Sequence, residues 1–397
     1  MANSIKTPLW TGSFIAICLA HFVMTMGFHA CMPMFPLFLA DRFHLAGIGV
    51  GIIVASYTAS AIITRPPTGF CLDRFGRRGI YLSSYCLFAL VYLLYPLAEA
   101  PYAVALVRFT HGAFWGVTMG AANTAAIDLL PAQRRGEGIG YFGLTMVLGM
   151  SVGPALGTYV TEWMGYNFLF RSTAVLTLGG FLFLLQIRFP TIPRRMQPFS
   201  LHSLLERSSI PISLSTLVFC IAFSVFMNYA AMFARTLPDA SPGMYYLCMA
   251  FGTAVTRLIS GRRFDQAGPG VIINYGYGLL IVGCIALAVA QGSILFTIGG
   301  FLVGLGNGIT IPVFQAMINA LVPPERRGAA NATQMTAFDL GICIGLLSTS
   351  HVQSLVGWPM TFLILTGCIF TSACIFHFSA FPKYRKAISP KSGTASV

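Results

Sequence analysis

The sequence contains few charged residues and very few acidic ones. Only 9% of its 397 residues are charged, and 11 acidic residues stand against 24 basic ones. A soluble domain averages about 25% charged residues, so this chain lacks the polar surface that a soluble body of its size needs. Since 56% of the residues are hydrophobic, we expect a polytopic membrane protein.

The chemistry of common enzyme sites is also missing. The ten cysteines form no C-x-x-C pair, and most of them lie inside apolar runs, so they lack the spacing of a metal or redox site. There is no H-E-x-x-H motif and no aspartate-rich metal motif. We therefore expect no enzyme, no metal and no cofactor; a polytopic membrane enzyme is the least favoured alternative.

The excess of basic residues, a net charge of +13, does not indicate nucleic-acid binding. These residues lie in short loops between apolar runs and form no pattern interleaved with aromatics. Their distribution is typical of topology determinants instead. By the positive-inside rule we expect a multi-pass protein of the cell (inner) membrane, with both termini and the basic loop at 188–211 in the cytoplasm.

Apolar runs predict twelve membrane-spanning helices. They lie near 11–39, 46–68, 79–98, 101–130, 138–161, 167–187, 212–236, 243–261, 270–290, 293–322, 329–353 and 359–380. The loop at 188–211 separates six spans from six. We therefore predict an all-α membrane protein with a six-helix bundle at 1–187, a linker at 188–211 and a second bundle at 212–397.

A charge-dense stretch, GFCLDRFGRRG at 69–79, separates two long apolar runs. Four charges in so short a stretch would be costly in hydrocarbon, so we expect a tight loop at a membrane face. The stretch resembles the loop signature of the major facilitator superfamily of secondary transporters. The resemblance implies a gating motif made of Gly69, Asp73, Arg74, Gly76, Arg77 and Arg78. We expect Asp128, near the end of the span at 101–130, to pair with Arg134 or Arg135.

The two halves of the chain repeat one another at a constant offset. Asp73 recurs as Asp265, an offset of 265 − 73 = 192, and Gly76 recurs as Gly268. The stretch LLPAQRRG that ends at 136 recurs as LVPPERRG ending at 328. A single offset from the second predicted span to the fifth indicates a duplicated six-helix unit, as in transporters built from parallel repeats.

A stripe of small residues marks the fifth predicted span. Its glycines follow one another at every fourth position, which lets two helices approach closely. The pattern resembles the helix motif of proton-antiporting, drug-exporting members of the superfamily, and it consists of Gly149, Gly153, Pro154 and Gly157. The resemblance implies export, whereas generic helix packing explains the stripe without it.

Two charged residues stand inside apolar spans. Asp339 lies about ten residues into the eleventh span, near the midplane, where burial penalises the charged form of a carboxyl. We expect it to carry the coupling proton; a purely structural aspartate, hydrogen-bonded to Asn331 or Thr336, is the alternative. The R-F-x-x-G start of the fourth span resembles a superfamily motif that implies proton transfer by Arg108, with His111 beside it. An arginine that binds carbonyl groups structurally is the alternative there.

Polar residues within the first, fourth, seventh and tenth spans are the candidates for a substrate cavity, because the resemblance implies that these helices line it. They are His21, Thr25, His29, Trp115, Asn123, Asn228, Tyr229, Asn307 and Gln315. Core packing explains such residues equally well.

The sequence as a whole predicts a secondary active transporter. We expect a monomer in the lipid bilayer that exports a small, amphipathic molecule in exchange for protons by alternating access. A proton-coupled symporter or a uniporter that imports a small metabolite is the alternative.

Overall fold

The structure is a computed structural model that describes residues 8–131, 134–190, 206–323 and 326–388, with the side chains of 73, 136, 258–267, 327, 328 and 388 excluded. Almost all of these residues are helical, and none of them lies in a β-strand, which confirms the all-α prediction. The helices are α1 (Gly12–Cys31), α2 (Met34–Phe43), α3 (Ile48–Phe75), α4 (Arg77–Val91), η1 (Tyr92–Leu97), α5 (Pro101–Leu129), α6 (Arg135–Leu185), η4 (Arg207–Ser209), α7 (Ile210–Asn228), α8 (Ala230–Ala234), α9 (Pro242–Ala267), α10 (Pro269–Ala288), α11 (Ser293–Leu321), α12 (Arg327–Ile375), η6 (Phe376–Ala380) and α13 (Phe381–Ile388).

Eight helices of the described chain are long and apolar enough to cross a membrane. Two of these, α6 with 51 residues and α12 with 49, are too long for a single crossing. A straight helix of 50 residues would span about 75 Å, more than twice the ~30 Å hydrocarbon core. Each helix bends once, at Gly165 and Gly357, and so holds two of the predicted spans.

The bends repeat with the offset seen in the sequence. Gly165 has φ 78° and Gly357 has φ 75°, and 357 − 165 = 192. Gly76 and Gly268, also 192 residues apart, have φ 93° and 76°. All four residues adopt a left-handed backbone that strongly favours glycine. The duplication therefore extends from sequence to backbone conformation.

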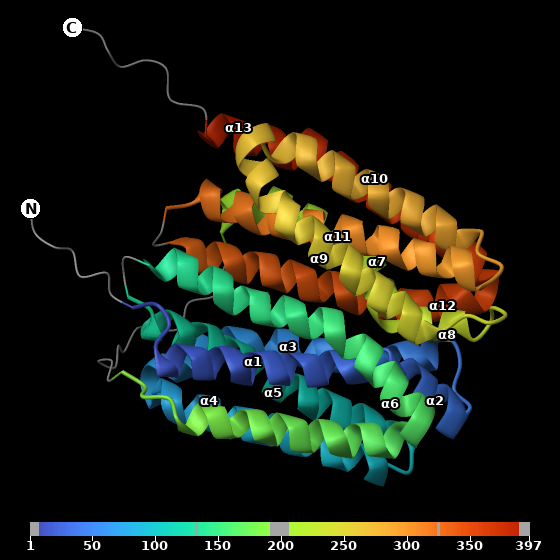
Figure 1. Cartoon of the computed structure of the whole chain (residues 1–397), viewed down its shortest axis with the longest axis horizontal. Helices are drawn as coiled ribbons and strands as arrows, with labels where there is room; N and C mark the ends of the chain where they lie inside the picture. Colours follow the sequence, from blue (N-terminus) through green and yellow to red (C-terminus); the bar gives the residue numbers. More distant parts are fainter. Residues whose placement is uncertain (1–7, 132–133, 191–205, 324–325, 389–397) are drawn as a thin grey trace, which may run out of the picture. The chain divides into compact units, whose positions relative to one another are not determined.

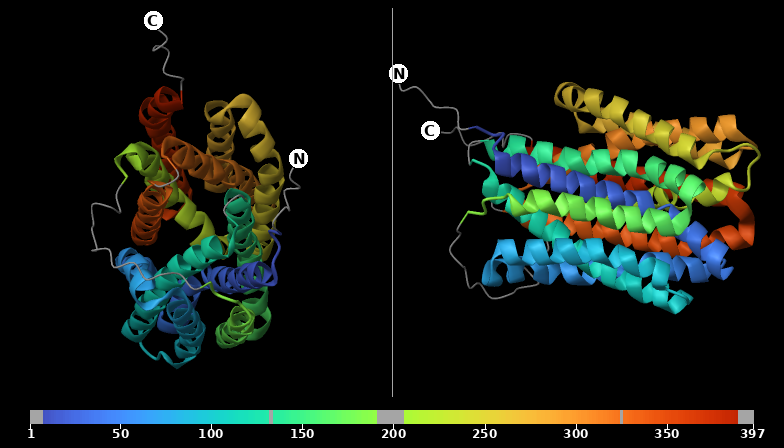
Figure 2. Two further views of the ribbon diagram at one scale, coloured as in Figure 1. Left: turned by 90° about the vertical axis from the view of Figure 1, so that its left-hand side faces the viewer. Right: turned by 60° about the horizontal axis from the view of Figure 1, so that its bottom comes forward.

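The chain divides into two compact units. One contains Met1–Phe199 with Met227–Met232 and Pro242–Leu247, and the other contains Ser200–Phe226, Phe233–Ser241 and Cys248–Val397. Most of the predicted linker, residues 191–205, lies outside the described residues. Figures 1 and 2 show that each unit is built from long helices laid side by side.

In both units, equivalent glycines lie where two helices touch. In the first unit Gly112 of α5 packs on the backbone of Tyr57 in α3, and in the second Gly304 of α11 packs on Met249 in α9. The offset is again 304 − 112 = 192 and 249 − 57 = 192. Small residues allow such close backbone contact between membrane helices, so the repeated glycines specify the same packing twice.

The stretch at 69–79 is more helical than the sequence analysis expected. Helix α3 continues through Gly69 to Phe75, and α4 begins at Arg77. The turn is made by Gly76 alone, so a tight turn is present as predicted, but it occupies one residue and the rest of the stretch is helical. A helix need not end where the chain leaves hydrocarbon, because its backbone hydrogen bonds are satisfied within the helix.

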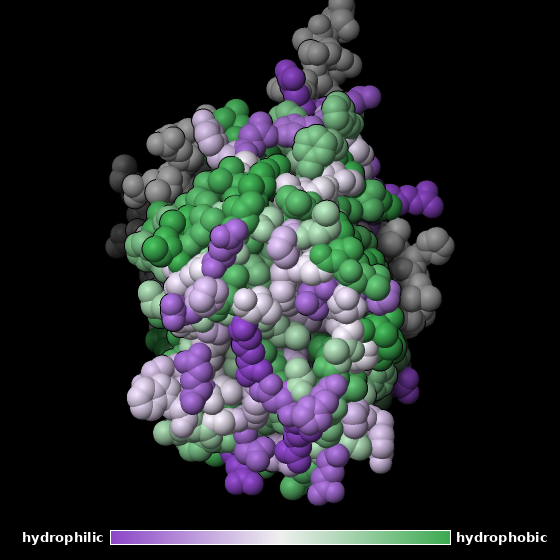
Figure 3. Space-filling model, turned by 90° about the vertical axis from the view of Figure 1, so that its right-hand side faces the viewer, coloured by the Kyte–Doolittle hydropathy of each residue, from purple (hydrophilic) through white to green (hydrophobic). Residues whose placement is uncertain are grey.

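Apolar side chains remain exposed along the helices, as membrane-facing surfaces require. Examples are Leu106, Val175 and Phe251, which are 67%, 70% and 64% exposed. At one end of the helices, by contrast, hydrophilic side chains gather among the apolar ones (Figure 3).

Candidate functional site

The arginines of the gating motif have different partners. Arg77, in the first turn of α4, forms an ion pair with Asp128 in the last turn of α5, and both side chains are less than one-fifth exposed. Arg134, in contrast, binds Glu137 at 2.8 Å. The pairing of Asp128 with Arg77 was not predicted, because α4 and α5 bring together residues that are distant in sequence; its pairing with Arg134 or Arg135 stays a prediction.

The remaining members of the motif differ in their surroundings. Arg74 stacks on the Phe70 and Phe75 rings, with its guanidinium carbon 5.9 and 5.6 Å from their centres. Arg78 is exposed. The side chain of Asp73 lies outside the described residues, so its predicted gating role stays a prediction.

The glycine stripe of α6 packs on α1. An added Cβ at Gly153 would stand 2.5 Å from the Met26 carbonyl oxygen, and one at Gly157 would overlap the Ala30 carbonyl. At Gly149 it would overlap the Thr25 hydroxyl. Pro154 lies inside the helix beside the stripe. The stripe therefore fixes how closely the first and fifth spans approach.

Arg108 is fully buried within the first unit, where it is 1% exposed. Its Nη2 donates a 2.9 Å hydrogen bond to the Val54 carbonyl in α3, and its guanidinium carbon lies 3.9 Å from the centre of the Phe35 ring. Contact of a desolvated cation with an aromatic face is worth about 2 kcal/mol. Over the described ranges no carboxylate pairs with Arg108. In this structure Arg108 therefore binds a backbone carbonyl, as the structural alternative to proton transfer predicts.

His111 is held within the same helix, one turn from Arg108. Its Nδ1 lies 3.0 Å from the Tyr95 hydroxyl, and Tyr95 also interacts electrostatically with Arg108. The imidazole packs at 4.4 Å from the rings of Phe88 and Tyr92. Tyr95 therefore connects the two predicted residues, and the sequence analysis had no local signal for it.

Two histidines of α1 have their tautomers set by their partners. His29 Nδ1 lies 2.7 Å from the Thr25 carbonyl oxygen, which can only accept, so Nδ1 carries the proton. His21 Nδ1 lies 2.6 Å from the Thr145 hydroxyl, which itself donates to Phe142 at 2.7 Å. The neutral rings therefore leave Nε2 as an acceptor. His21 Nε2 has no hydrogen-bond partner among the described residues.

The other predicted cavity residues fall into two groups. Trp115 is 3% exposed and stacks on the Phe28 ring at 3.9 Å, while Asn307 is also buried, without a partner for its Oδ1 in the described part of the chain. Asn123 and Gln315 are exposed. Buried Asn228 and Tyr229 lie where α7 ends and α8 begins.

Asp339 is the only carboxylate among the buried side chains of the described residues, at 6% exposure. It lies 339 − 327 = 12 residues into α12, about 18 Å from its start. Cys220 of α7 and Cys343 lie within electrostatic range of it. Asn331 donates instead to Asn319, and the Thr336 hydroxyl to the Ala332 carbonyl.

Comparison with known proteins decides the family. The sequence matches the family model described as Major Facilitator Superfamily over residues 17–299 and 212–396. The chain belongs to the major facilitator superfamily. It is therefore a membrane transporter and not an enzyme.

Curated relatives align with nearly the whole length of this chain. The Staphyloferrin B transporter of Staphylococcus aureus (strain NCTC 8325 / PS 47) is 24% identical over 396 residues, or 94% of this chain and 93% of the relative. The multi-drug resistance efflux pump PmrA of Streptococcus pneumoniae serotype 4 is 22% identical, covering 94% and 96%. A bacterial homologue of the human lysosomal transporter Spinster, crystallised inward-facing and occupied, has a TM-score of 0.80 at 13% identity, covering 97% and 100%.

A polar site just before α7 was also not predicted from the sequence. Glu206 binds the Ser208 hydroxyl at 2.8 Å and Arg326 at 2.7 Å, while its own N–H donates to Thr333. The Ser208 hydroxyl and then the Arg326 guanidinium lower the pKa of Glu206 from 4.5 to about 2. This ion pair fixes the start of α7 to the start of α12, and no local pattern marks its partners.

Proposed function

We propose that this transporter exports a small, amphipathic molecule and takes up protons in exchange, with Asp339 as the group that carries the proton. The observation that carries the proposal is the burial of this carboxyl within α12. Ionisable residues inside membrane segments are costly to keep and characteristically serve transport. A carboxyl that binds a proton on one side of the membrane and releases it on the other couples transport to the proton gradient.

Arg108 and His111 are the proposed partners in proton transfer within the first unit. The described residues thus include one buried cation, in α5, and one buried carboxyl, in α12. Tyr95 contacts His111 and interacts with Arg108. A change in the protonation of His111 would therefore alter the electrostatic environment of Arg108 through Tyr95. A hydroxyl and an imidazole that share a hydrogen bond are able to pass a proton along it.

The names of two relatives support the proposed direction of transport, and the composition of the proposed cavity supports the proposed class of substrate. One relative is named an efflux pump and another a staphyloferrin transporter. The proposed cavity residues His21, Thr25, His29, Trp115, Asn123, Asn228, Tyr229, Asn307 and Gln315 include no carboxylate and no arginine. They suit a molecule that combines apolar surface with a few hydrogen-bonding groups.

We further propose a monomer in the cell membrane with cytoplasmic termini and with bundles at 1–187 and 212–397 joined by the linker at 188–211. In this arrangement the Arg77–Asp128 ion pair lies at the cytoplasmic face, where the gating motif acts. The glycine stripe on α6 keeps the first and fifth spans together as the bundles alternate.

Inverted membrane vesicles provide the test. Respiration acidifies their interior, and a substrate of a proton antiporter added outside should release protons that a pH-sensitive dye reports. The candidates range from lipophilic cations to polycarboxylate chelators. Substrate-dependent proton release supports the proposal. Transport that follows the substrate gradient and ignores the pH gradient would instead support a uniporter, and accumulation with protons in right-side-out vesicles would support an importing symporter.

A further inference from the structure

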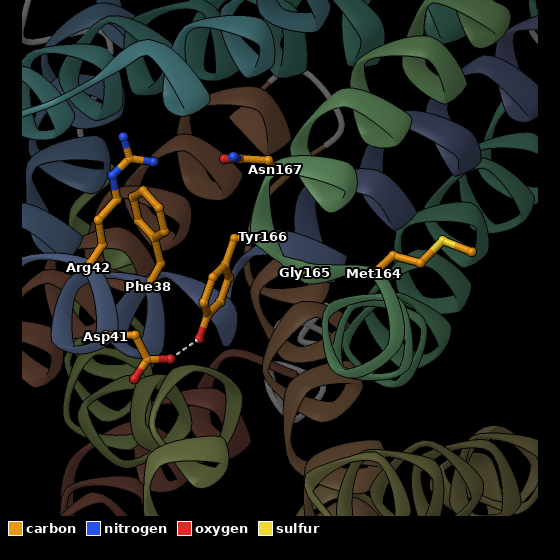
Figure 4. Close-up of a pocket in the computed structure, with 7 residues that line it drawn as sticks. All are labelled: Phe38, Asp41, Arg42, Met164, Gly165, Tyr166 and Asn167. Carbon is orange, nitrogen blue, oxygen red and sulfur yellow. Dashed lines mark hydrogen bonds between the residues drawn. The ribbon is translucent and has the colours of Figure 1, made fainter.

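A polar cup lies where α6 reverses direction (Figure 4). It encloses about 360 Å³ between the end of α2 and the α6 bend, and its lining includes Phe38, Asp41, Arg42, Gly165, Tyr166 and Asn167. A chain that reverses between two membrane spans does so at a bilayer face. The cup therefore lies at the level of the lipid headgroups.

The same position in the second unit is apolar. In the cup, the Tyr166 hydroxyl donates a 2.6 Å hydrogen bond to Asp41 Oδ2. The equivalent residues are 41 + 192 = 233 and 166 + 192 = 358, and Phe233 and Trp358 pack with ring centres 5.5 Å apart. An aromatic pair is thus enough to hold this bend against its neighbour. The polar groups of the first unit need a reason beyond packing.

The two walls of the cup carry opposite charges. Arg42 and Asn167 lie on one side of it, and Asp41 and Tyr166 lie on the other (Figure 4). Arg42 is exposed, with its guanidinium carbon 5.8 Å from the centre of the Phe38 ring. It has no carboxylate partner in the part of the chain that the structure describes. The cup therefore offers a cation for an anion and, opposite it, a carboxylate for a cation.

Two large apolar side chains that precede Gly165 in α6 are strongly exposed. Trp163 is 74% exposed and Met164 is 61% exposed, and the Met164 side chain points away from the cup. Trp163 packs against Tyr159 with ring centres 5.7 Å apart. Tryptophan and tyrosine gather at membrane–water interfaces because their rings are apolar and carry a polar group. A ligand of the cup is therefore placed to have acyl chains beside it.

We propose that the cup binds a phospholipid headgroup that carries a phosphate and a primary ammonium group. The phosphate binds the Arg42 guanidinium and the Asn167 amide, and the ammonium group donates to the Asp41 carboxylate. Tyr166 holds that carboxylate in place. The acyl chains lie against the exposed apolar side chains of Trp163 and Met164 in α6. Recognition of headgroups by charged pockets at a membrane face follows the ordinary rules of lipid binding.

The test titrates delipidated full-length protein in detergent with short-chain phosphatidylethanolamine, phosphatidylcholine and phosphatidylglycerol. Native mass spectrometry counts bound lipids. We expect phosphatidylethanolamine to bind about fivefold more tightly than phosphatidylcholine, since each exposed charge pair contributes modestly. Arg42→Gln should weaken the binding of phosphatidylethanolamine and of phosphatidylglycerol to a similar extent. Asp41→Asn should remove the preference for phosphatidylethanolamine over phosphatidylcholine. Arg188→Gln, which removes an exposed arginine just beyond the C-terminal end of α6, should change nothing.

A further variant tests whether a loss of lipid binding could come from misfolding. The double substitution Asp41→Phe with Tyr166→Trp copies the apolar pair of the second unit, and we expect it to keep the melting temperature while losing the lipid preference. Glycerophosphoethanolamine, which has the headgroup without chains, should bind much more weakly than the lipid. Equal binding of this soluble molecule would overturn the lipid assignment, as would equal affinities for all three lipids in the unmodified protein.

Discussion

Gly157 of α6 lies directly on the backbone carbonyl of Ala30 in α1, where an added Cβ would overlap the oxygen. Gly153, one turn earlier, has the same relationship to Met26. The stripe that resembles an antiporter motif is therefore required by packing, whatever its part in coupling. Any further role must act through the closeness of these two helices.

Gly157→Ala should destabilise the protein because α1 and α6 must separate to admit a methyl group. Overpacking of this kind costs about 1–3 kcal/mol. Gly143→Ala is the matched control, since an added Cβ at Gly143 of α6 meets nothing within 4 Å. It should be neutral or slightly stabilising. Thermal unfolding of the detergent-solubilised variants checks this, and equal melting temperatures would refute the close approach.

Arg77→Gln should lower stability, because it removes the ion pair with Asp128 at a partly buried site. The loss should fall between the ~1 kcal/mol of an exposed pair and the 3–5 kcal/mol of a buried one. Arg78→Gln, which removes an exposed neighbour, should have little effect. Exchanging the charges, with Arg77→Asp and Asp128→Arg together, should restore much of the loss; a double variant no better than the single one would contradict the pairing.

His21→Asn and His21→Gln should separate the two nitrogens of the ring. Asparagine places an amide near the Nδ1 position and keeps the bond to Thr145, whereas glutamine places its amide near Nε2. If Nε2 accepts a hydrogen bond from the substrate, His21→Asn should weaken substrate binding about fivefold, the worth of one hydrogen bond. His21→Gln should retain most of the affinity. Equal losses in substrate titrations of the two variants would point to packing alone.

Acid should weaken the ion pair between Glu206 and Arg326. Because the pKa of Glu206 is lowered from 4.5 to about 2, its contribution to stability is complete above about pH 4.5 and is lost as the pH falls toward 2. Glu206→Gln should lower the melting temperature at pH 7 and flatten its decline below pH 4.5. Glu162→Gln, at an exposed site, should have the melting temperature of the unmodified protein both at pH 7 and below pH 4.5. Parallel pH profiles for all three proteins would rule out this linkage.

Much of the fold could be predicted because the sequence is duplicated. The offset of 192 residues identifies equivalent glycines, and these lie where the backbone has a positive φ or where two helices touch. Gly76 and Gly268 illustrate the first case, and Gly112 and Gly304 the second. The apolar runs gave the helices, although the helical continuation of α3 to Phe75 was not foreseen, since charge marks the membrane edge and not the helix end.

Side-chain partners could be predicted far less well. Arg77 meets Asp128 and Tyr95 meets His111 because helices pack, and a single sequence carries no record of such contacts. The cup around Asp41 and Tyr166 was missed for the same reason. The offset offered one unused signal: the equivalent residues are Phe233 and Trp358, so a polar pair in one half replaces an apolar pair in the other.

The most direct measurement of the central claim compares two modes of transport by Asp339→Asn in reconstituted vesicles. Asparagine keeps the size of the side chain but cannot carry a proton. We predict that the variant still exchanges substrate for substrate across the membrane at a rate near that of the unmodified protein, and that it fails to accumulate substrate when a pH gradient is imposed. Undiminished accumulation driven by the pH gradient would contradict the account.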